Sequence, residues 1–330
     1  MRDPASALIV GAVEGIVLSN EERRFFEREA PSGVTLFKRN IPPSFTEFRK
    51  LIVDIQSTRV HESPPLVIAI DQEGGRVARL RSPFPEQGPP EKLVDGKKDE
   101  ESLLFIENHA FIVGSSLKGL GVNVNFAPVV DIRTPSTVDA IGDRVYGSTA
   151  EDVCLRAGAY LSGLQSSGVY GCLKHFPGKG DASVDTHINS AVIKLSREEL
   201  EARELVPYRR LLPNTKLVMV SHGIFPVFGQ KEASRSPEII GGLLRKDMGF
   251  KGVVVSDDMN MGAIPQAEKV WQDAIVEAVA AGVDMLLVCR HLERQIKALE
   301  ALRNAAKKSR AFSARLEESS ERMISFRKLL

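Results

Sequence analysis

The chain alternates short apolar runs with amphipathic segments along most of its length. Eight runs of strand length stand at residues 7–13, 34–38, 65–71, 122–130, 168–176, 216–223, 252–258 and 283–289. Helical periodicity marks segments between them, such as 44–60, 151–168 and 237–249, the last of which ends at Gly249. Strands that are apolar at nearly every position indicate a parallel sheet covered on both faces.

Eight such strand–helix units predict an α/β fold, a single (β/α)8 TIM-type barrel without a second α/β domain. We expect one barrel domain over residues 1–330, with a C-terminal helix at roughly 311–328. The competing fold is an open, doubly wound sheet, which usually carries a glycine-rich fingerprint after its first strand. Residues 11–20, GAVEGIVLSN, do not match that fingerprint, so the barrel is favoured.

Composition narrows the class of protein further. Of the 330 residues, 43% are hydrophobic and 26% charged, and the formal net charge of +1 does not favour nucleic acid or an anionic membrane as partner. The apolar N-terminus lacks the basic start of a signal peptide and contains Glu14, so we interpret it as the first core strand and expect a cytoplasmic protein. Cys154, Cys172 and Cys289 are far apart, and we expect buried thiols in a reducing compartment.

Polar residues stand where several apolar runs end. In a (β/α)8 barrel the C-terminal ends of the strands line the active site. A single polar residue there is usually a cap or a turn former, but five such positions indicate a shared rim. These positions are Asp71, Asp131, Lys174–His175, Ser221–His222 and Asp257–Asp258.

Asp257 is the first catalytic candidate among them. It ends the run 252–258, so its carboxylate is expected to project into the mouth of the barrel. An aspartate after a strand commonly caps the next helix instead. Because two aspartates are adjacent here, Asp258 can cap or orient while Asp257 reacts.

Asp185 and His187 form the second candidate, in a long polar loop after the fifth run. Two residues apart on an extended segment, their side chains point to the same side, so the carboxylate can hydrogen-bond the imidazole. That contact fixes the tautomer and raises the basicity of the ring, which makes a general acid and base near neutral pH.

Residues 71–80, DQEGGRVARL, open a loop after the third run. Asp71 can accept two sugar hydroxyls, and the glycine pair after it allows the backbone to approach a ligand. Arg76, Arg79 and Arg144 offer forked donors for hydroxyls or a carboxylate, although ordinary surface charge is the alternative for each.

A metal site is possible in principle but is not expected. The candidate ligands share no HxH or HExxH spacing, and Lys174 and Lys179 would compete with a cation. We therefore expect no metal and no other cofactor. The ligands considered are His175, Asp181, Asp185, His187 and His222.

Five segments together resemble a known family. In order and across nearly the whole chain, they are similar to bacterial β-N-acetylglucosaminidases of glycoside hydrolase family 3. The segments are 71–77 (DQEGGRV), 125–132 (NFAPVVDI), 141–147 (IGDRVYG), 174–187 (KHFPGKGDASVDTH) and 256–263 (SDDMNMGA).

The resemblance implies a retaining mechanism through a covalent glycosyl-enzyme. Asp257 would be the nucleophile, His187 the general acid and base, and Asp185 the partner of His187. Most glycosidases use a second carboxylate as the acid. Here a protonated histidine would give its proton to the leaving oxygen, and the neutral ring would then activate water.

By the same resemblance, the substrate-binding residues surround N-acetylglucosamine in the −1 subsite, and His222 receives no specific task. Asp71 would bind ring hydroxyls. The residues around it would be Arg79, Arg144, Lys174 and His175.

One residue departs from the pattern expected for the family. Lys179 stands where a histidine is expected, which leaves the Asp185–His187 pair intact but can change loop closure or pH behaviour. The segment VSHGIFP also differs from the usual alanine-histidine version.

The single barrel and the Asp-x-His loop favour an N-acetylglucosaminidase over the family's β-glucosidases, which generally carry a second α/β domain. The implied substrate is a small-molecule muropeptide, N-acetylglucosamine linked to 1,6-anhydro-MurNAc peptide, from cell-wall recycling. A β-glucosidase or an N-acetylglucosaminide phosphorylase of the same family remains an alternative. A sugar-binding barrel without activity is another, although intact Asp257, Asp185 and His187 argue against it. The sequence does not predict the oligomeric state.

Overall fold

The computed structural model describes residues 3–82, 84, 87–93, 100–135, 137, 141–180 and 191–330. The strands are β1 (Ile9–Gly11), β2 (Gly33–Leu36), β3 (Val67–Ile70), β4 (Gln72–Gly74), β5 (Val77–Ala78), β6 (Val124–Asn125), β7 (Tyr170–Phe176), β8 (Leu217–Val220), β9 (Val253–Ser256) and β10 (Leu286–Leu287).

The main helices are α1 (Pro4–Ala7), α2 (Asn20–Glu29), α3 (Phe45–Ser57), α4 (Pro90–Leu93), α5 (Glu100–Leu120), α6 (Ala150–Ser166), α7 (Arg197–Glu199), α8 (Leu205–Leu211), α9 (Glu268–Ala281), α10 (Leu292–Lys308) and α11 (Arg310–Arg327). Other helical segments are η1 (Lys38–Asn40), η2 (Gly142–Arg144), η3 (Leu200–Glu204), η4 (Leu212–Asn214), η5 (Pro226–Phe228), η6 (Ala233–Arg235) and η7 (Glu238–Asp247).

Eight of the strands form one parallel sheet that curls into a barrel. Their order is β10-β1-β2-β3-β6-β7-β8-β9, so each strand lies beside the next one along the chain. The two ends of the sheet meet where Val255 bridges Met285, and the Ser256 N–H donates to the Met285 carbonyl at 2.9 Å. Every predicted apolar run overlaps one of these strands, and the prediction of a single (β/α)8 barrel is confirmed.

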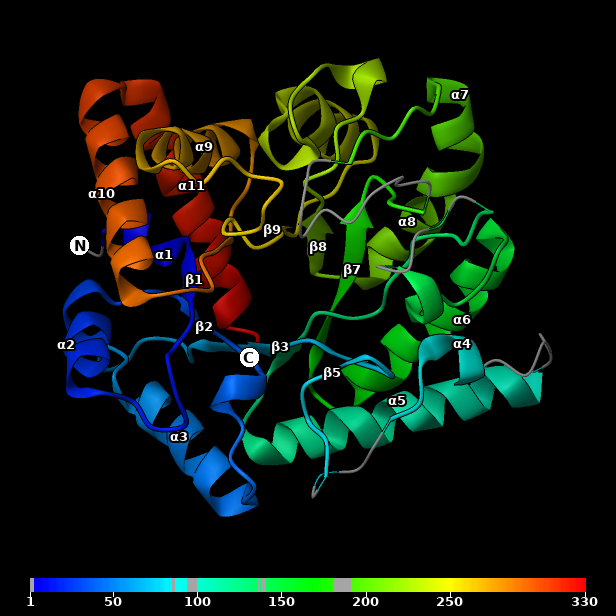
Figure 1. Ribbon diagram of the computed structural model, residues 1–330, viewed down its shortest axis with the longest axis horizontal. Helices are drawn as coiled ribbons and strands as arrows, with labels where there is room; N and C mark the ends of the chain where they lie inside the picture. Colours follow the sequence, from blue (N-terminus) through cyan, green and yellow to red (C-terminus); the bar gives the residue numbers. More distant parts are fainter. Residues whose placement is uncertain are drawn as a thin grey trace.

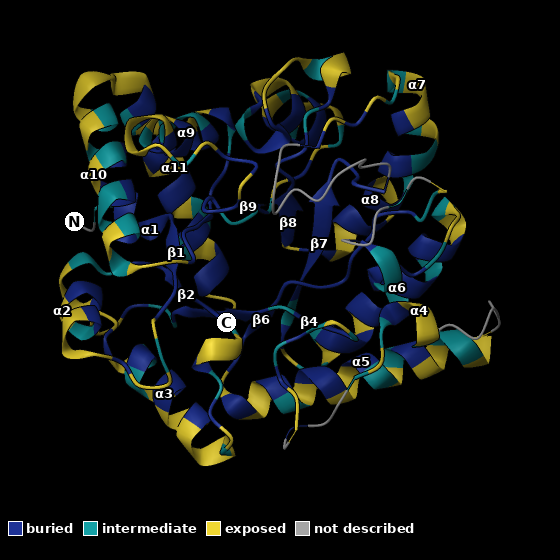
Figure 2. Cartoon of the chain, viewed as in Figure 1, coloured by how far each residue is buried: buried dark blue, intermediate teal, exposed yellow. Residues whose placement is uncertain are grey.

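Helices cover the outside of this barrel (Figure 1). Figure 2 shows buried strands at the centre and helices whose exposed residues lie on the outer side. Side-chain caps begin several helices: Ser44 accepts from the Glu47 N–H in α3, and Thr149 accepts from the Asp152 N–H in α6. Gly249, with φ of 71°, follows η7 in the left-handed conformation, as its place after an amphipathic segment predicts.

The barrel interior has its own apolar core, and the C-terminal helix α11 contributes to it. Met323 and Phe326 of α11 are buried in the cluster that holds the inward-facing strand residues Val10, Val67 and Val124. The ring of Phe326 also meets Tyr170, at the start of β7, edge to face with centroids 5.4 Å apart. Helix α11 therefore covers the N-terminal end of the barrel, opposite the rim where the strands end.

A buried charge network fastens α11 to this lower end. The carboxylate of Asp284, just before β10, is fully buried and accepts from Arg245 on η7 and from Arg315 and Arg322 on α11. It also accepts from the Ser319 hydroxyl at 2.9 Å. A carboxylate without solvent requires such donors, so the last helix and the barrel stabilise each other.

A small hairpin, β4–β5, continues from β3 over the rim and was not predicted. Gln72 fixes it, because its side-chain oxygen accepts from the Arg79 N–H at 2.8 Å and from the Leu80 N–H at 2.9 Å. The Gln72 N–H in turn donates to Asn125 at the end of β6. The hairpin therefore holds the residues after β3 against the mouth of the barrel.

Three general findings bear on the predictions. No helix in the described part of the chain is long and apolar enough to cross a membrane. Cys154, Cys172 and Cys289 are buried and free. Among the residues with described positions, no group of three or more His, Cys, Asp or Glu could hold a metal ion.

Candidate active site

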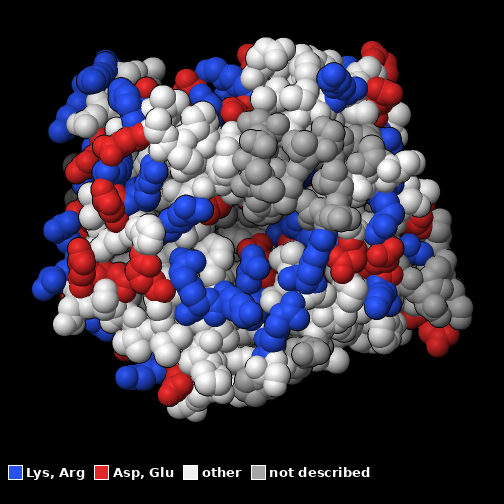
Figure 3. Space-filling view, in the orientation of Figure 1, with Lys and Arg blue, Asp and Glu red and all other residues white. Residues whose placement is uncertain are grey.

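A cavity of about 380 Å³ opens where the barrel strands end. Figure 3 shows this face hollowed near its centre, with acidic atoms inside and basic side chains along one side of the rim. The predicted residues Asp71, Arg79, Arg144, Lys174, His175 and Asp257 all line the cavity. The other lining residues are Thr35, Phe37, Glu73, Val77, Phe126, Met219, Asp258, Met261, Leu287 and Cys289.

Lys174, on β7, is the centre of a buried ion network. Its ammonium group donates to Asp71 at 2.8 Å and to Glu73 at 2.6 Å, and its side chain is 2% exposed. Burial alone would lower the pKa of Lys174, but the charges of Asp71 and Glu73 raise it. Lys174 is therefore charged, and it joins two acids that follow β3.

Each of these acids has a second cationic partner. Arg79 donates to Asp71 at 3.0 Å, and Arg144 grips Glu73 with two bonds of 2.7 and 2.8 Å. Burial would raise the pKa of Asp71, but Lys174 and Arg79 hold it well below its usual range. In the same way, Arg144 and Lys174 outweigh burial and lower the pKa of Glu73 from 4.5 to about 2. Both acids are ionised acceptors at neutral pH.

His175 is held beside this network in its neutral form. Its Nδ1 lies 2.8 Å from Asp131 Oδ2 and its Nε2 lies 3.4 Å from Arg144 Nη2. Because an arginine can only donate, Nε2 of His175 must accept. The ring proton is therefore on Nδ1, which donates a hydrogen bond to Asp131. Burial and the charges of Lys179 and Arg144 hold the pKa of His175 well below its usual range, in agreement with this tautomer.

Asp131, in the segment that follows β6, organises the backbone after β7. Its Oδ1 accepts from the Lys179 N–H at 2.7 Å and from the His175 N–H at 3.3 Å. The peptide bond between Lys174 and His175 is cis. One buried carboxylate thus fixes both the ring of His175 and the start of the loop that follows.

The turn after β9 carries Asp257 into the cavity. The Asp257 N–H donates to the carbonyl of Val220 on β8, and the Asp258 N–H donates to Asp257 Oδ1 at 2.9 Å. The Asp258 carboxylate accepts from the N–H groups of Asn260 and Cys289 at 3.1 and 3.2 Å. Asp258 therefore orients the turn, as its position beside Asp257 predicts.

The arginines near the rim are of two kinds: some lie beside the cavity and its Phe37 ring, and others form surface ion pairs. Arg79 lines the cavity and its guanidinium carbon lies 5.8 Å from the centre of the Phe37 ring. Arg39 lies 4.8 Å from the same ring. Arg76 is exposed and pairs with Asp143 at 3.1 Å, outside the cavity lining, so surface charge is the better description of it.

Asp185 and His187 lie outside the described residues, together with the rest of 181–190. Both flanks of that segment are held by hydrogen bonds to other loops. Before it, the Gly180 carbonyl accepts from the Thr137 hydroxyl at 2.8 Å. After it, the Ala191 carbonyl accepts from the Ile224 N–H at 2.8 Å, in the loop that follows β8.

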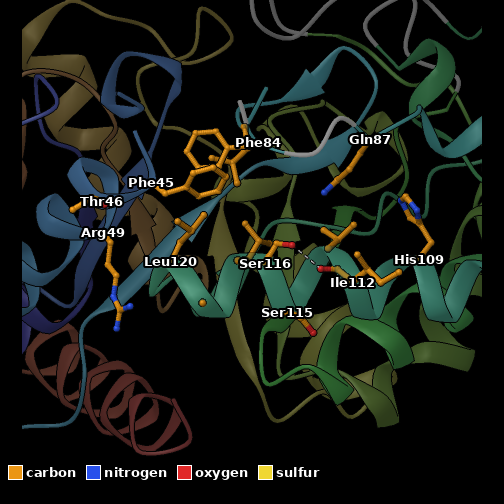
Figure 4. Close-up of a pocket in the computed structure, with 14 residues that line it drawn as sticks. Phe45, Thr46, Arg49, Phe84, Gln87, His109, Ile112, Ser115, Ser116 and Leu120 are labelled. Carbon is orange, nitrogen blue, oxygen red and sulfur yellow. Dashed lines mark hydrogen bonds between the residues drawn. The ribbon is translucent and has the colours of Figure 1, made fainter. Parts of the chain in front are cut away.

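A second cavity, of about 530 Å³, lies outside the barrel between α3 and α5 (Figure 4). Its walls are mainly apolar, from side chains such as Phe45, Phe84, Ile112 and Leu120, and its lining includes no carboxylate. It therefore lacks the acidic groups of the cavity at the strand ends, which is the better candidate for chemistry.

Sequence reasoning missed Glu73 and gave no role to Asp131. A signal for Glu73 was present, because it stands two residues after Asp71 and shares its side of an extended segment. Its partner Arg144 is 71 residues away, so the pairing depends on how two loops pack. Asp131 was recognised as a strand-end acid, but its contact with His175 requires the geometry after β7.

Comparison with known proteins identifies the family of the chain. Residues 10–326 match the glycosyl hydrolase family 3 N-terminal domain. A beta-hexosaminidase of Stenotrophomonas maltophilia is 35% identical over 300 residues, which cover 89% of this chain and 86% of that protein.

Solved structures of similar proteins share the fold. A family 3 beta-N-acetylglucosaminidase from Paenibacillus superimposes with a TM-score of 0.90 at 33% identity, covering 98% of this chain and 62% of that one. NagZ from Neisseria gonorrhoeae, solved with N-trifluoroacetyl-D-glucosamine, gives a TM-score of 0.80 at 26% identity, covering 98% and 99% of the two chains. The chain belongs to glycosyl hydrolase family 3 and is a glycoside hydrolase.

Proposed function

We propose that the protein is a retaining β-N-acetylglucosaminidase that removes N-acetylglucosamine from the non-reducing end of muropeptides. The observation that carries this proposal is the position of Asp257 in a cavity whose other wall is the ionised Asp71–Lys174–Glu73 network. A carboxylate facing a rigid set of acceptors and donors suits a sugar held by its hydroxyls over a nucleophile. The similarity to proteins named beta-hexosaminidase supports the N-acetyl sugar.

The ion network would bind the sugar in the −1 subsite. Asp71 is ionised and can accept hydrogen bonds from sugar hydroxyls, while Arg79 and Lys174 fix its orientation. Arg144 and neutral His175 complete the set of polar groups in the cavity. Because these groups already pair with one another, they need little rearrangement when substrate enters.

Asp257 would attack the anomeric carbon through one carboxylate oxygen, forming an ester as the bond to the leaving oxygen breaks. His187 would give its proton to that oxygen, with Asp185 holding the ring. In the second step His187 takes a proton from water, the water oxygen bonds to the anomeric carbon, and the ester to Asp257 breaks. Two inversions at one carbon leave the β configuration retained.

The flanks of residues 181–190 support this role for the Asp185–His187 pair. The Lys179 N–H is held by Asp131, the same acid that fixes His175 in the cavity. The loop thus begins at the rim of the cavity. An extended chain of seven residues, the separation of Gly180 and His187, can span roughly 25 Å, which is long enough to bring a histidine to a substrate seated there.

The basic rim supports an anionic aglycone. Phe37 lines the cavity, and the guanidinium groups of Arg39 and Arg79 make cation–π contacts with its ring. Figure 3 shows Lys and Arg side chains gathered along one side of the opening. A muropeptide carries carboxylates beyond the scissile bond, and a positive rim attracts them.

The first test compares an aryl β-N-acetylglucosaminide with the aryl β-glucoside, without and with phosphate. We expect strong preference for the N-acetyl substrate and no effect of phosphate. A preference for the glucoside would contradict the assignment, and a sugar phosphate formed only with phosphate would identify a phosphorylase. Muropeptide turnover is then measured at rising salt, where we expect a loss that the neutral aryl substrate does not show.

Two variants test the residues. Asp257→Ala is expected to lose nearly all turnover while folding normally, and Asp273→Ala, on the surface of α9, serves as control. His187→Ala should lower turnover most for substrates with poor leaving groups, because good ones need little protonation. Normal turnover of Asp257→Ala, or equal losses on both substrates for His187→Ala, would remove the assigned role.

A further inference from the structure

His222, in the loop after β8, is fully buried beside the turn that carries Asp257. Its Nδ1 lies 2.7 Å from the hydroxyl oxygen of Ser234 on η6. Its Nε2 lies 3.1 Å from the carbonyl oxygen of Asp258. Both contacts are shielded from solvent, since His222 and Ser234 are each 0% exposed. The ring therefore connects a distant loop to the residue next to the proposed nucleophile.

The two contacts define the protonation of the ring. A peptide carbonyl only accepts, so Nε2 of His222 must carry a proton. Burial lowers the pKa of His222, although the charges of Asp257 and Asp258 oppose this. The neutral ring then has a lone pair on Nδ1, which accepts from the Ser234 hydroxyl. The two hydrogen bonds therefore run in one direction: Ser234 donates to His222, and His222 donates to the Asp258 carbonyl.

The same residue, Asp258, also contacts the nucleophile. The Asp258 N–H donates to Asp257 Oδ1 at 2.9 Å. The carbonyl that accepts from His222 belongs to the same residue, so one Cα separates the two contacts. Neighbouring strands fix the two ends of the turn. The Asp257 N–H donates to the Val220 carbonyl of β8, and the Met259 N–H donates to the Leu287 carbonyl of β10. Between these two points, the Asp258 carbonyl accepts from the Met261 N–H at 2.9 Å, within the turn, and from His222, which reaches it from the loop after β8.

Ser234 is itself fixed to the strand end that carries the histidine. Its N–H donates to the Ser221 carbonyl at 3.0 Å, and the Ala233 N–H donates to the Gly223 carbonyl at 2.8 Å. The loop from 221 to 236 is thus closed on itself. The His222 imidazole reaches from this loop to the nucleophile turn.

We propose that Ser234 and His222 form a positioning pair that holds the Asp258 backbone, and through its N–H the carboxylate of Asp257, in the orientation required for attack. In this proposal the pair acts on the Asp257 carboxylate and not on the proton given to the leaving group. Its effect is therefore the same for every leaving group, unlike that of a proton donor. The inference rests on the proposed role of Asp257 as nucleophile.

The test measures kcat and KM for two aryl β-N-acetylglucosaminides, one with a good and one with a poor leaving group. Ser234→Ala leaves Nδ1 without its donor and is expected to lower kcat about tenfold on both substrates, with KM within twofold. This is the kinetic equivalent of one hydrogen bond. His222→Leu should lower kcat about a hundredfold, again on both substrates.

Rescue distinguishes positioning from packing. The amide nitrogen of His222→Gln can donate to the Asp258 carbonyl. The kcat of this variant should therefore be at least about tenfold higher than that of His222→Leu. Ser234→Thr keeps the hydroxyl and should remain within threefold of wild type. Thermal unfolding is recorded for each variant, so that Ser234→Ala carries the test if His222→Leu does not fold.

Unchanged kcat on both substrates for Ser234→Ala and His222→Leu would overturn the proposal. A loss confined to the poor leaving group would also overturn it, because the pair would then act on proton donation. Asp257→Ala is measured in parallel. If that variant keeps normal turnover, the proposed function fails, whereas an inactive Asp257→Ala beside normal pair variants refutes the positioning role alone.

Discussion

Glu73 should stabilise the folded protein through its charge, and Glu73→Gln tests this directly. The carboxylate accepts two bonds from Arg144 and one from Lys174, and its side chain is 1% exposed. The substitution keeps the shape but removes the charge, so both cations lose an ionised partner. Breaking a buried ion pair from one side costs about 3–5 kcal/mol in other proteins.

The pKa of Glu73 gives a second estimate of the same quantity. Its fall from 4.5 to about 2 is between two and three pKa units, and at about 1.4 kcal/mol per unit this is roughly 3 kcal/mol. Because the folded-state pKa is depressed, this stability is complete above the unfolded pKa and is lost as the pH falls toward 2. The difference between wild type and Glu73→Gln should therefore be about 3 kcal/mol at pH 7 and about 1 kcal/mol at pH 3.

Urea unfolding at both pH values measures these differences, with the fluorescence of the buried Trp271, the one tryptophan of the chain, as probe. Glu300→Gln on the exposed side of α10 is the matched control and should change stability by less than about 0.5 kcal/mol at either pH. A loss below about 1 kcal/mol at pH 7 would refute the reasoning. A loss of the same size at both pH values would also refute it, since the effect would then not come from charge.

Three further predictions concern parts of the molecule away from the cavity at the strand ends. Asp284→Asn removes the charge that three arginines share beneath the barrel, and should lower the free energy of unfolding by about 3 kcal/mol while kcat at 25 °C stays within twofold; unchanged urea midpoints would contradict it. Gly249→Ala places a side chain at φ of 71°, so it should destabilise by about 1 kcal/mol. Gly119→Ala, near the end of α5, places a Cβ where no atom lies within 4 Å, and should instead stabilise by up to about 1 kcal/mol. A change of the same sign for both glycines would contradict this expectation.

The strands and their polar ends could be read from the sequence because burial on both faces leaves continuous apolar runs. The same logic found Asp71 after β3 and Asp257 after β9. Helix α5 gives a weaker pattern, because Leu104, Phe105, Phe111 and other apolar residues on it are exposed. Its apolar positions therefore do not mark one face.

The contacts that complete the site depend on tertiary packing. Lys174 was assigned to the substrate, but its ammonium group is shared between Asp71 and Glu73, which no spacing along the chain reveals. The tautomer of His175 follows from Arg144 and Asp131, which come from two other loops. The Asp185–His187 pair stays a prediction from its spacing.

The seal that α11 forms beneath the barrel has a consequence for synthesis. All eight strands are made once the chain reaches β10, which ends at Leu287, yet Met323 and Phe326 come later. A growing chain at that stage has its catalytic rim complete but its other end open to water, with the apolar interior exposed. Maturation therefore waits for the final helix, and a chain interrupted before it would be a substrate for chaperones and proteases instead of a working hydrolase.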